Sequence, residues 1–355
     1  MKKTLLATAV AASLAATGAQ AATVYDQDGT KLDVYGRIAM GVGGGGPEYN
    51  DAGQKIDNGA EFVDVYSRLG FNMSQQITSD LSAFGRLEWR FDGDERTGPS
   101  GNGNTGFKEV RQSYIGLKSA QYGTVQGGNF DSFYNQFVSL PFDVYIDRGL
   151  EFAGHPKQSR GDSIGYYTPD LSGFTVFLQG KMYSDNGNVE GVREEGDVVA
   201  AQGGVKYEQG PVTVGLGFVD DVVRGGGNGE IMGGLIGSYA INDNLSVRLG
   251  YEGRENSDTR GGGYDTVGLG TSYSTGPWAF AADIYDVNPD GEGAEDRTSW
   301  ALGSYYKVSS NFNVFLELQQ ADQQSITVNL DGLDSSVEEA DGNDVYWLTG
   351  ARYFF

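Results

Sequence analysis

The feature that most constrains this chain is an alternation of apolar and polar residues with a period of two, which recurs along most of its length. It is clear in residues 32–40, 245–252, 278–284 and 312–319. A period of two is the signature of a β-strand with two different faces. After residue 21 no apolar stretch is long enough to cross a membrane as a helix, which takes about 20 residues. The chain is therefore predicted to be all-β.

Alternation alone would also fit a soluble β-sandwich. Strand length and loop pattern distinguish such a sandwich from strands that cross a membrane. The strands run for about ten residues, as tilted membrane-crossing strands do, whereas strands of globular proteins are mostly shorter. Short turns at 78–80, 242–244 and 309–311 alternate with long polar loops at 92–106, 184–195, 288–296 and 322–343. Aromatic residues cluster near strand ends, as in the interfacial girdles of barrels; they are Trp89, Phe91, Tyr273, Trp278, Tyr305 and Tyr306.

A transmembrane antiparallel β-barrel of about 16 strands follows from this pattern. An even number of strands closes the wall and leaves no open edge, which would be costly in lipid. A barrel of this size encloses water, whereas a barrel of about eight strands is filled by side chains. The expected strands begin near Lys31, Phe62, Leu81, Phe107, Thr124, Ser159, Phe174, Asp197, Val212, Glu230, Leu245, Tyr264, Trp278, Arg297, Phe312 and Asp344.

The N-terminus has the pattern of a secretory signal peptide. Lys2 and Lys3 precede an apolar stretch from Leu5 to Ala16, and residues 19–21 read Ala-Gln-Ala, a small-x-small cleavage site. We therefore expect residues 1–21 to be removed and residues 22–355 to form a single barrel domain. The mature chain would then begin at Ala22.

Composition excludes several classes of protein. Removal of residues 1–21 leaves 334 residues with 48 acidic and 23 basic side chains, a net charge of −25. Such a chain lacks the basic patch that nucleic acid requires. It has no cysteine, so neither disulfides nor thiolate metal sites are available. We expect no cofactor, no metal and no nucleic-acid partner.

Three motifs suggest other functions and are set aside. The glycines of 41–46 follow a strand, but no helical pattern comes next, as dinucleotide binding would require. Gly-Asp-Ser-Ile-Gly at 161–165 resembles a nucleophile elbow, yet the single histidine, His155, precedes Ser163 and no helix start follows it. The acidic residues of 331–344 lack the order of a calcium-binding loop. The protein is predicted not to be an enzyme, with a barrel hydrolase kept as an alternative.

Over most of its mature length the chain resembles the trimeric general diffusion porins of Gram-negative bacteria. The match rests on residues 32–37, on 67–71 with 76–81, on 111–118 with 122–125, and on the final Tyr353-Phe354-Phe355. The resemblance implies a homotrimer in the outer membrane, in contact with lipid and lipopolysaccharide. It also implies that the C-terminal Phe355 acts as the assembly signal.

The resemblance further implies that the third extracellular loop folds into the barrel and faces a basic wall. By position, that wall would consist of Arg37, Arg68, Arg111 and Arg160. Alternation agrees for the first three, and it adds Arg86, because an arginine that pointed into lipid would cost about 2–4 kcal/mol. The same alternation places Val65 on the outer face.

The loop departs from the family's usual Pro-Glu-Phe-Gly-Gly-Asp motif and carries Leu140-Pro141-Phe142-Asp143 instead. Its acidic partners cannot be transferred by alignment, so Asp131, Asp143 and Asp147 are candidates by composition.

The predicted function is a channel for passive diffusion of ions and small hydrophilic solutes, with a weak preference for cations. A sugar-specific porin is the alternative, because five aromatic residues are expected to face the lumen: Phe84, Phe177, Tyr183, Tyr285 and Phe315.

Overall fold

The computed structural model describes residues 21–46, 48–49, 55–56, 59–94, 107–152, 161–183, 198–222, 227–291, 295–321, 325–329, 336–340 and 345–355. Within these ranges no helix has the length and apolar character needed to cross a membrane. The predicted signal peptide lies outside the described residues, so its cleavage stays a prediction. The first strand begins at Ala22.

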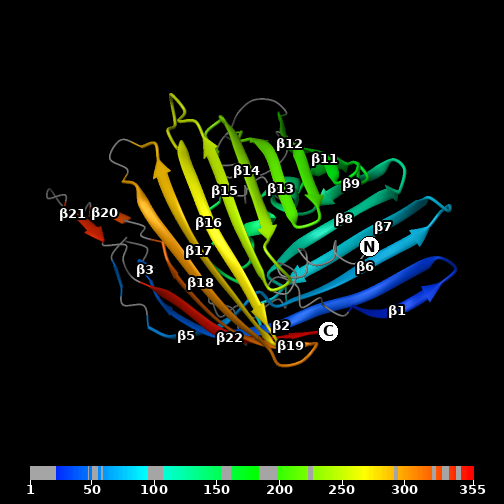
Figure 1. Ribbon diagram of the computed structural model, residues 1–355, viewed down its shortest axis with the longest axis horizontal. Helices are drawn as coiled ribbons and strands as arrows, with labels where there is room; N and C mark the ends of the chain where they lie inside the picture. Colours follow the sequence, from blue (N-terminus) through cyan, green and yellow to red (C-terminus); the bar gives the residue numbers. More distant parts are fainter. Residues whose placement is uncertain are drawn as a thin grey trace.

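The strands form one closed antiparallel wall, drawn in Figure 1. Its sheet has 18 strands, of which β5 and β6 follow each other along one edge of β2, while β1 continues the line of β22 along the other edge. Counting β5 with β6 and β1 with β22 leaves 16 positions around the barrel (18 minus 2). The strands are β1 (Ala22–Gln27), β2 (Thr30–Gly45), β5 (Glu61–Asp64), β6 (Arg68–Gln76), β7 (Leu81–Arg90), β8 (Glu109–Ser119), β9 (Gly123–Asn129), β10 (Ser163–Tyr167), β11 (Phe174–Tyr183), β12 (Val198–Gln209), β13 (Val212–Asp220), β14 (Ile231–Ala240), β15 (Leu245–Arg254), β16 (Tyr264–Thr275), β17 (Trp278–Pro289), β18 (Arg297–Lys307), β19 (Phe312–Gln320) and β22 (Tyr346–Phe354).

Four more strands pair as two short hairpins outside this wall. They are β3 (Glu48–Tyr49) with β4 (Lys55–Ile56), and β20 (Ser325–Asn329) with β21 (Ser336–Ala340).

The predicted barrel is confirmed, and each of its 16 expected strands begins within four residues of the observed start. The sequence reading did not foresee β1. Asp28 and Gly29 both have positive φ, 51° and 73°, which allows the tight turn that folds β1 back on β2. The first strand and the C-terminus meet there, because Ala22 pairs with Val34 and Phe355 exchanges two backbone hydrogen bonds with Gly36.

The two faces of the wall differ as the alternation predicts. Leu249 and Leu269 point outward and are 61% and 55% exposed, whereas Arg248 and Glu252 point inward and are buried. An apolar outer face and a polar inner face are what a barrel in lipid requires.

Among the described residues, Val65 contradicts the predicted alternation. Val65 is not on the outer face, but is buried against Ala39, Val144 and Leu348. The cause is a break between β5 and β6, where Tyr66 has φ 62°, a left-handed conformation that is uncommon for a residue other than glycine. The break shifts the alternation by one residue and turns the Tyr66 ring toward the barrel interior, where it meets Arg90 and Asp147.

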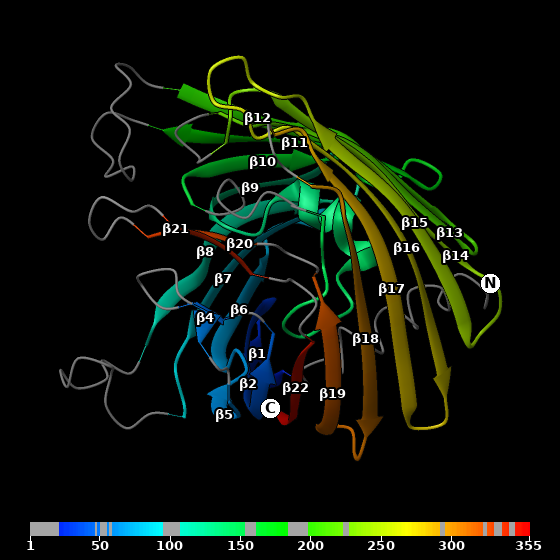
Figure 2. The ribbon, with the colours of Figure 1, turned by 90° about the vertical axis from the view of Figure 1, so that its left-hand side faces the viewer.

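The segment 130–152, between β9 and β10, lies along the inner face of the wall. Its helical turns η1 (Asn135–Ser139) and η2 (Leu140–Phe142) contact β12, β13 and β14. Figure 2 shows these turns between the two sides of the barrel. Approach to the wall is close at Gly215, where a Cβ would lie 2.3 Å from the Phe137 carbonyl oxygen. A glycine is therefore needed at this position.

Candidate functional site: the narrowed lumen

Arginines gather on one part of the inner wall, formed by β2, β6, β7, β8 and β22, which we call the open half. In the strand register Arg37 lies opposite Arg68, and Arg68 lies opposite Arg90. Arg86 and Arg111 lie on β7 and β8, and Arg352 lies on β22. Of the predicted basic residues, Arg37, Arg68, Arg86 and Arg111 are thus brought together, while Arg160 lies outside the described residues.

A buried carboxylate organises this cluster. Glu88 on β7 is fully buried and forms ion pairs with Arg68 (3.3 Å), Arg86 (3.1 Å) and Arg111 (2.5 Å). It also accepts a hydrogen bond of 2.9 Å from the hydroxyl of Tyr35. The single Glu88 carboxylate therefore holds three guanidinium groups in place. It neutralises only part of their positive charge.

The three predicted loop acids have different surroundings. Asp131 is bound to the wall, since Arg111 and Gln112 donate to its carboxylate over 3.2 and 2.6 Å. Asp147 accepts hydrogen bonds from the hydroxyls of Tyr66 and Tyr346. Asp143, by contrast, is exposed, and among the described residues no side chain donates to its carboxylate.

The environment of Asp143 also affects its ionisation. The protein that surrounds the carboxyl group reduces its hydration, and the neighbouring Asp131 carboxylate repels its negative charge. Together these effects raise the pKa of Asp143, and the attraction of Arg111 and Arg68 opposes them only in part. Asp143 therefore loses its charge at a higher pH than an ordinary aspartate.

The rest of the segment is fixed to the opposite part of the inner wall, β11 to β19, which we call the covered half. Gln179 accepts from the Phe133 N–H at 2.8 Å, and Glu252 accepts from the Tyr134 hydroxyl at 2.8 Å. Glu317 accepts from the N–H groups of Ile146 and Asp147 at 2.6 and 3.2 Å. These bonds, spread over several strands, determine the path of the segment.

The expected lumen-facing aromatics do not form an exposed track. Phe177, Tyr285 and Phe315 are each at most 3% exposed. Phe177 stacks on Phe137 and Tyr285 packs against Phe142, both from the segment 130–152. These three rings fill the space between this segment and the covered half, so they cannot present their faces to a sugar in transit, whereas Phe84 is half-buried on β7 of the open half and packs on Tyr114.

Sequence reasoning missed Glu88, Arg90 and Arg352 as parts of the site. Alternation gave the signal for Glu88 and Arg90, because they share the inner face of β7 with Arg86. The signal for Arg352 was its inward position beside the outward-facing Tyr353, which is 50% exposed.

The other sequence motifs are accounted for in part. The hydroxyl of Ser163 donates to the Gly161 carbonyl and accepts from Gln179, so it is already engaged, and His155 lies outside the described residues. No group of three potential metal-ligating side chains occurs in the part of the chain that the structure describes. Of the acidic loop 331–344, the structure describes only residues 336–340, as β21.

Comparison with known proteins agrees with this geometry. Residues 7–325 match the family model described as Gram-negative porin. The chain belongs to the Gram-negative porins. A monosaccharide porin of Halomonas sp. is 32% identical over 325 residues, 84% of each chain. Outer membrane porin F of Salmonella typhimurium is 26% identical over 340 residues, covering 96% of this chain and 74% of that protein.

Solved structures show the same fold. An anion-selective porin from Comamonas acidovorans superposes with a TM-score of 0.69 at 20% identity, over 92% of this chain and all of the other. The OmpF of Salmonella typhi in complex with daunomycin gives a TM-score of 0.66 at 21% identity, over 94% and 100% of the two chains. This porin is thus a β-barrel channel of the Gram-negative outer membrane, through which ions and small hydrophilic solutes diffuse passively.

Proposed function

We propose that the narrowest part of this porin lies between the arginines of the open half and Asp143 of the segment 130–152, and that the channel weakly prefers cations at low salt. The observation that carries the proposal is the exposed Asp143 carboxylate, on which Arg68 and Arg111 act across the lumen. Asp131 and Asp147 support the segment rather than face the ions, because protein donors occupy their carboxylates.

The preference for cations is argued from the whole charge of the protein. A net charge of −25 after signal-peptide removal concentrates cations near the mouths of the pore. The arginines oppose this at the narrowest level. The Debye length is about 8 Å at about 0.15 M salt, so added salt screens the distant loop carboxylates more than the charges inside the pore. The preference should therefore weaken as salt rises.

Reversal potentials across a KCl gradient test this proposal. We expect a K⁺/Cl⁻ permeability ratio above one at low salt that falls as both solutions are made more concentrated. A ratio that is independent of salt, or an anion preference at low salt, would contradict it.

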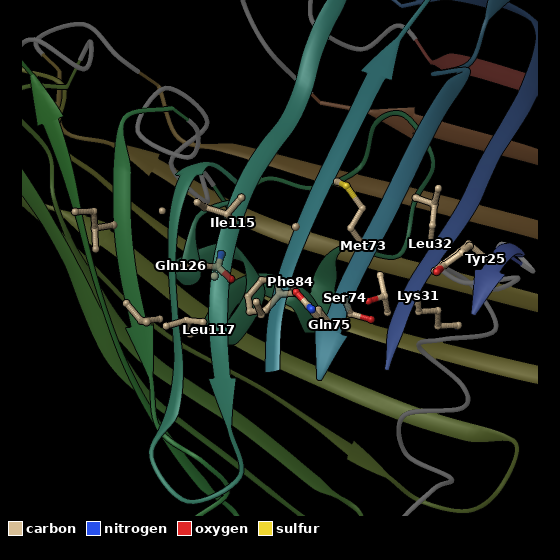
Figure 3. A pocket seen from close by; sticks show the side chains of 17 residues that line it. Tyr25, Lys31, Leu32, Met73, Ser74, Gln75, Phe84, Ile115, Leu117 and Gln126 are labelled. Atoms are coloured by element: carbon tan, nitrogen blue, oxygen red, sulfur yellow. The ribbon is translucent and has the colours of Figure 1, made fainter. Parts of the chain in front are cut away.

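We also propose that the porin is a homotrimer that uses the outer face of β2 and β6 to β10. This face has an apolar hollow of about 1000 Å³, shown in Figure 3. Ile115, Leu117 and Met73 line it, and Gly85 leaves room at its floor. A second copy of this chain would bury these side chains and fill the hollow, as the cores of subunit interfaces do.

A pair of matched variants tests this interface. Gly85→Leu fits the isolated barrel, since its Cβ meets Met73 and Ile115 at ordinary distances of 3.5 and 3.6 Å, but it fills the hollow. Gly233→Leu is the control, on the outer face of β14, where the nearest atom to a Cβ is 4.0 Å away. We expect only Gly85→Leu to release monomers on unheated gels. If both variants stay trimeric, the hollow is filled by lipid instead.

The assembly role of Phe355 is a further part of the proposal. Its ring covers Gly36, where a Cβ would lie 2.4 Å from the ring, and its backbone bonds close the β2–β22 seam. Deletion of Phe355 should lower the yield of folded barrel in the outer membrane, measured by heat-modifiable gel mobility, while Phe354→Leu should not. An unchanged yield after deletion would remove this role. Contact of the porin with lipopolysaccharide stays a prediction.

A sugar-specific channel is the second candidate, and the name of the Halomonas relative favours it. The covered aromatics count against it. Liposome swelling with monosaccharides and disaccharides separates the two functions, because a diffusion pore sorts these solutes by size and a sugar-specific pore sorts them by stereochemistry.

A further inference from the structure

Two guanidinium groups of the open half form no hydrogen bond or ion pair with a carboxylate of the residues that the structure describes. Arg37 is 8% exposed, and its one hydrogen bond to a described residue runs from Nε to the Tyr66 carbonyl at 3.0 Å. Arg352 is 3% exposed, and its one such bond runs from Nε to Asn313 Oδ1 at 3.1 Å. The terminal nitrogens of both side chains donate to no described residue. Neither arginine forms an ion pair within the described chain.

The charges near Arg37 do not balance it, whereas Arg352 has one carboxylate nearby. The groups that act most strongly on Arg37 are four other arginines: Arg68, Arg352, Arg111 and Arg90. The carboxylate that acts on Arg352 is Glu317, whose hydrogen bonds come from Tyr305, Ile146 and Asp147 and not from Arg352, so the terminal N–H groups of Arg352 stay available to another acceptor. An arginine keeps its charge at neutral pH, and the terminal nitrogens of both side chains are not among the buried polar atoms without a partner, so they are open to an anion from the lumen.

The geometry suits such an anion. Arg37 and Arg352 point inward from neighbouring strands, diagonal to one another, since Arg37 is paired with Phe354 and Arg352 with Ala39. Residues at diagonal positions on one face of two paired strands lie about 7–8 Å apart, so the long side chains of Arg37 and Arg352 can reach the same ligand. The Arg352 guanidinium lies over the rings of Phe315 and Phe354, at 5.8 and 5.4 Å, which fix its orientation. Because Asn313 Oδ1 accepts from Arg352, the Asn313 NH₂ group remains as a further donor.

We propose that Arg37, Arg352 and Asn313 form a binding subsite for a small oxyanion, with inorganic phosphate as the simplest ligand. The flat N–H edges of two guanidinium groups match the oxygens of phosphate better than they match chloride. A bound phosphate adds negative charge beside the narrowed lumen. The bound phosphate therefore narrows the path of the ions through the lumen. Its negative charge also raises the permeability of the channel to cations relative to anions.

Planar-bilayer recordings of the purified porin test this subsite. Potassium phosphate is added at neutral pH to both sides of a membrane held in a KCl gradient. We expect phosphate to lower the single-channel current in a saturable manner and to raise the K⁺/Cl⁻ permeability ratio. Arg352→Gln should weaken both effects about tenfold or more, since it removes charged hydrogen bonds.

Two further variants complete the design. Arg148→Gln is the control, because Arg148 is a loop cation 53% exposed and outside the subsite, and it should respond to phosphate as the unaltered porin does. Asn313→Leu keeps both arginines and should weaken the phosphate effect less than Arg352→Gln. Phosphate titration calorimetry on the detergent-solubilised porin supplies a readout if Arg352→Gln inserts poorly. Equal phosphate effects in the unaltered porin, Arg352→Gln and Asn313→Leu would overturn the subsite, while leaving the KCl selectivity untouched.

Discussion

The open half and the covered half of the inner wall are built from the same strand pattern, yet they present different surfaces to water. On the open half, Glu88 neutralises part of a group of arginines that borders the lumen. On the covered half, Arg248 and Asp283 form a buried ion pair, and the buried Glu252 and Glu317 accept hydrogen bonds from the segment 130–152. The difference comes from the segment 130–152, most of which packs on the covered half and which reaches the open half through Asp131 and Asp147. A charged residue of the open half can therefore affect ion conduction, whereas a charged residue of the covered half affects only the stability of the protein.

The largest effects are expected when one buried acid is replaced by its amide in each half of the wall and the two variants are compared in stability and ion selectivity. Glu88→Gln removes the shared negative charge from three arginines, whereas Asp283→Asn removes a negative charge from the covered half. Removing one partner of a buried ion pair costs about 3–5 kcal/mol, so both variants should unfold at lower temperature. Only Glu88→Gln should also move the K⁺/Cl⁻ permeability ratio toward chloride, by about two- to fivefold for one unit charge near the ion path.

Thermal unfolding in detergent and reversal potentials in a KCl gradient measure the two quantities on the same preparations. A selectivity change of equal size in Asp283→Asn would show that the covered half also faces the conducting path.

A second test compares acids within the segment 130–152. Asp143→Asn should shift selectivity toward anions, because this carboxylate is exposed to the lumen. Asp147→Asn should shift it less, since two tyrosine hydroxyls already bind that group. Arg68→Ala with Arg111→Ala should do the reverse and enlarge the conductance. Reversal potentials rank the variants by their selectivity. A larger shift for Asp147→Asn than for Asp143→Asn would mean that Asp147, and not Asp143, faces the ion path.

The pH dependence sharpens the role of Asp143. Its pKa is raised, so on acidification it is protonated at a higher pH than an ordinary aspartate, whose pKa is about 3.9. The cation preference should therefore begin to fall above the pH range in which exposed loop aspartates titrate. In Asp143→Asn this early fall should be missing. Selectivity curves that coincide for the two proteins would assign the titration to another group.

The smallest effect is expected on the covered half. Tyr134→Phe removes the hydroxyl that binds Glu252 and leaves that buried carboxylate with the Tyr264 hydroxyl at 2.9 Å. The loss of one buried hydrogen bond should cost about 1–3 kcal/mol of unfolding free energy. Single-channel conductance should stay unchanged, because Tyr134 is fully buried. A changed conductance would mean that this bond sets the position of the segment in the lumen.

The sequence by itself determined the barrel, its strand starts and the inward face of Arg37, Arg68, Arg86 and Arg111. These follow from an alternation with a period of two, which is a local property of the chain and survives wherever the backbone stays extended. The same local rule failed at Val65, where the left-handed Tyr66 breaks the alternation. No pattern in the sequence announced that break.

Only the tertiary structure decided which acids meet the arginines and which half of the wall is covered. Asp131, Asp143 and Asp147 are alike in sequence, but they differ in whether wall residues bind them. Those partners lie 19 or more positions away in the chain, and the path of the segment depends on hydrogen bonds to several strands at once. A lumenal charge pair is a long-range contact, so local periodicity can place each residue on a face but cannot pair it across the pore.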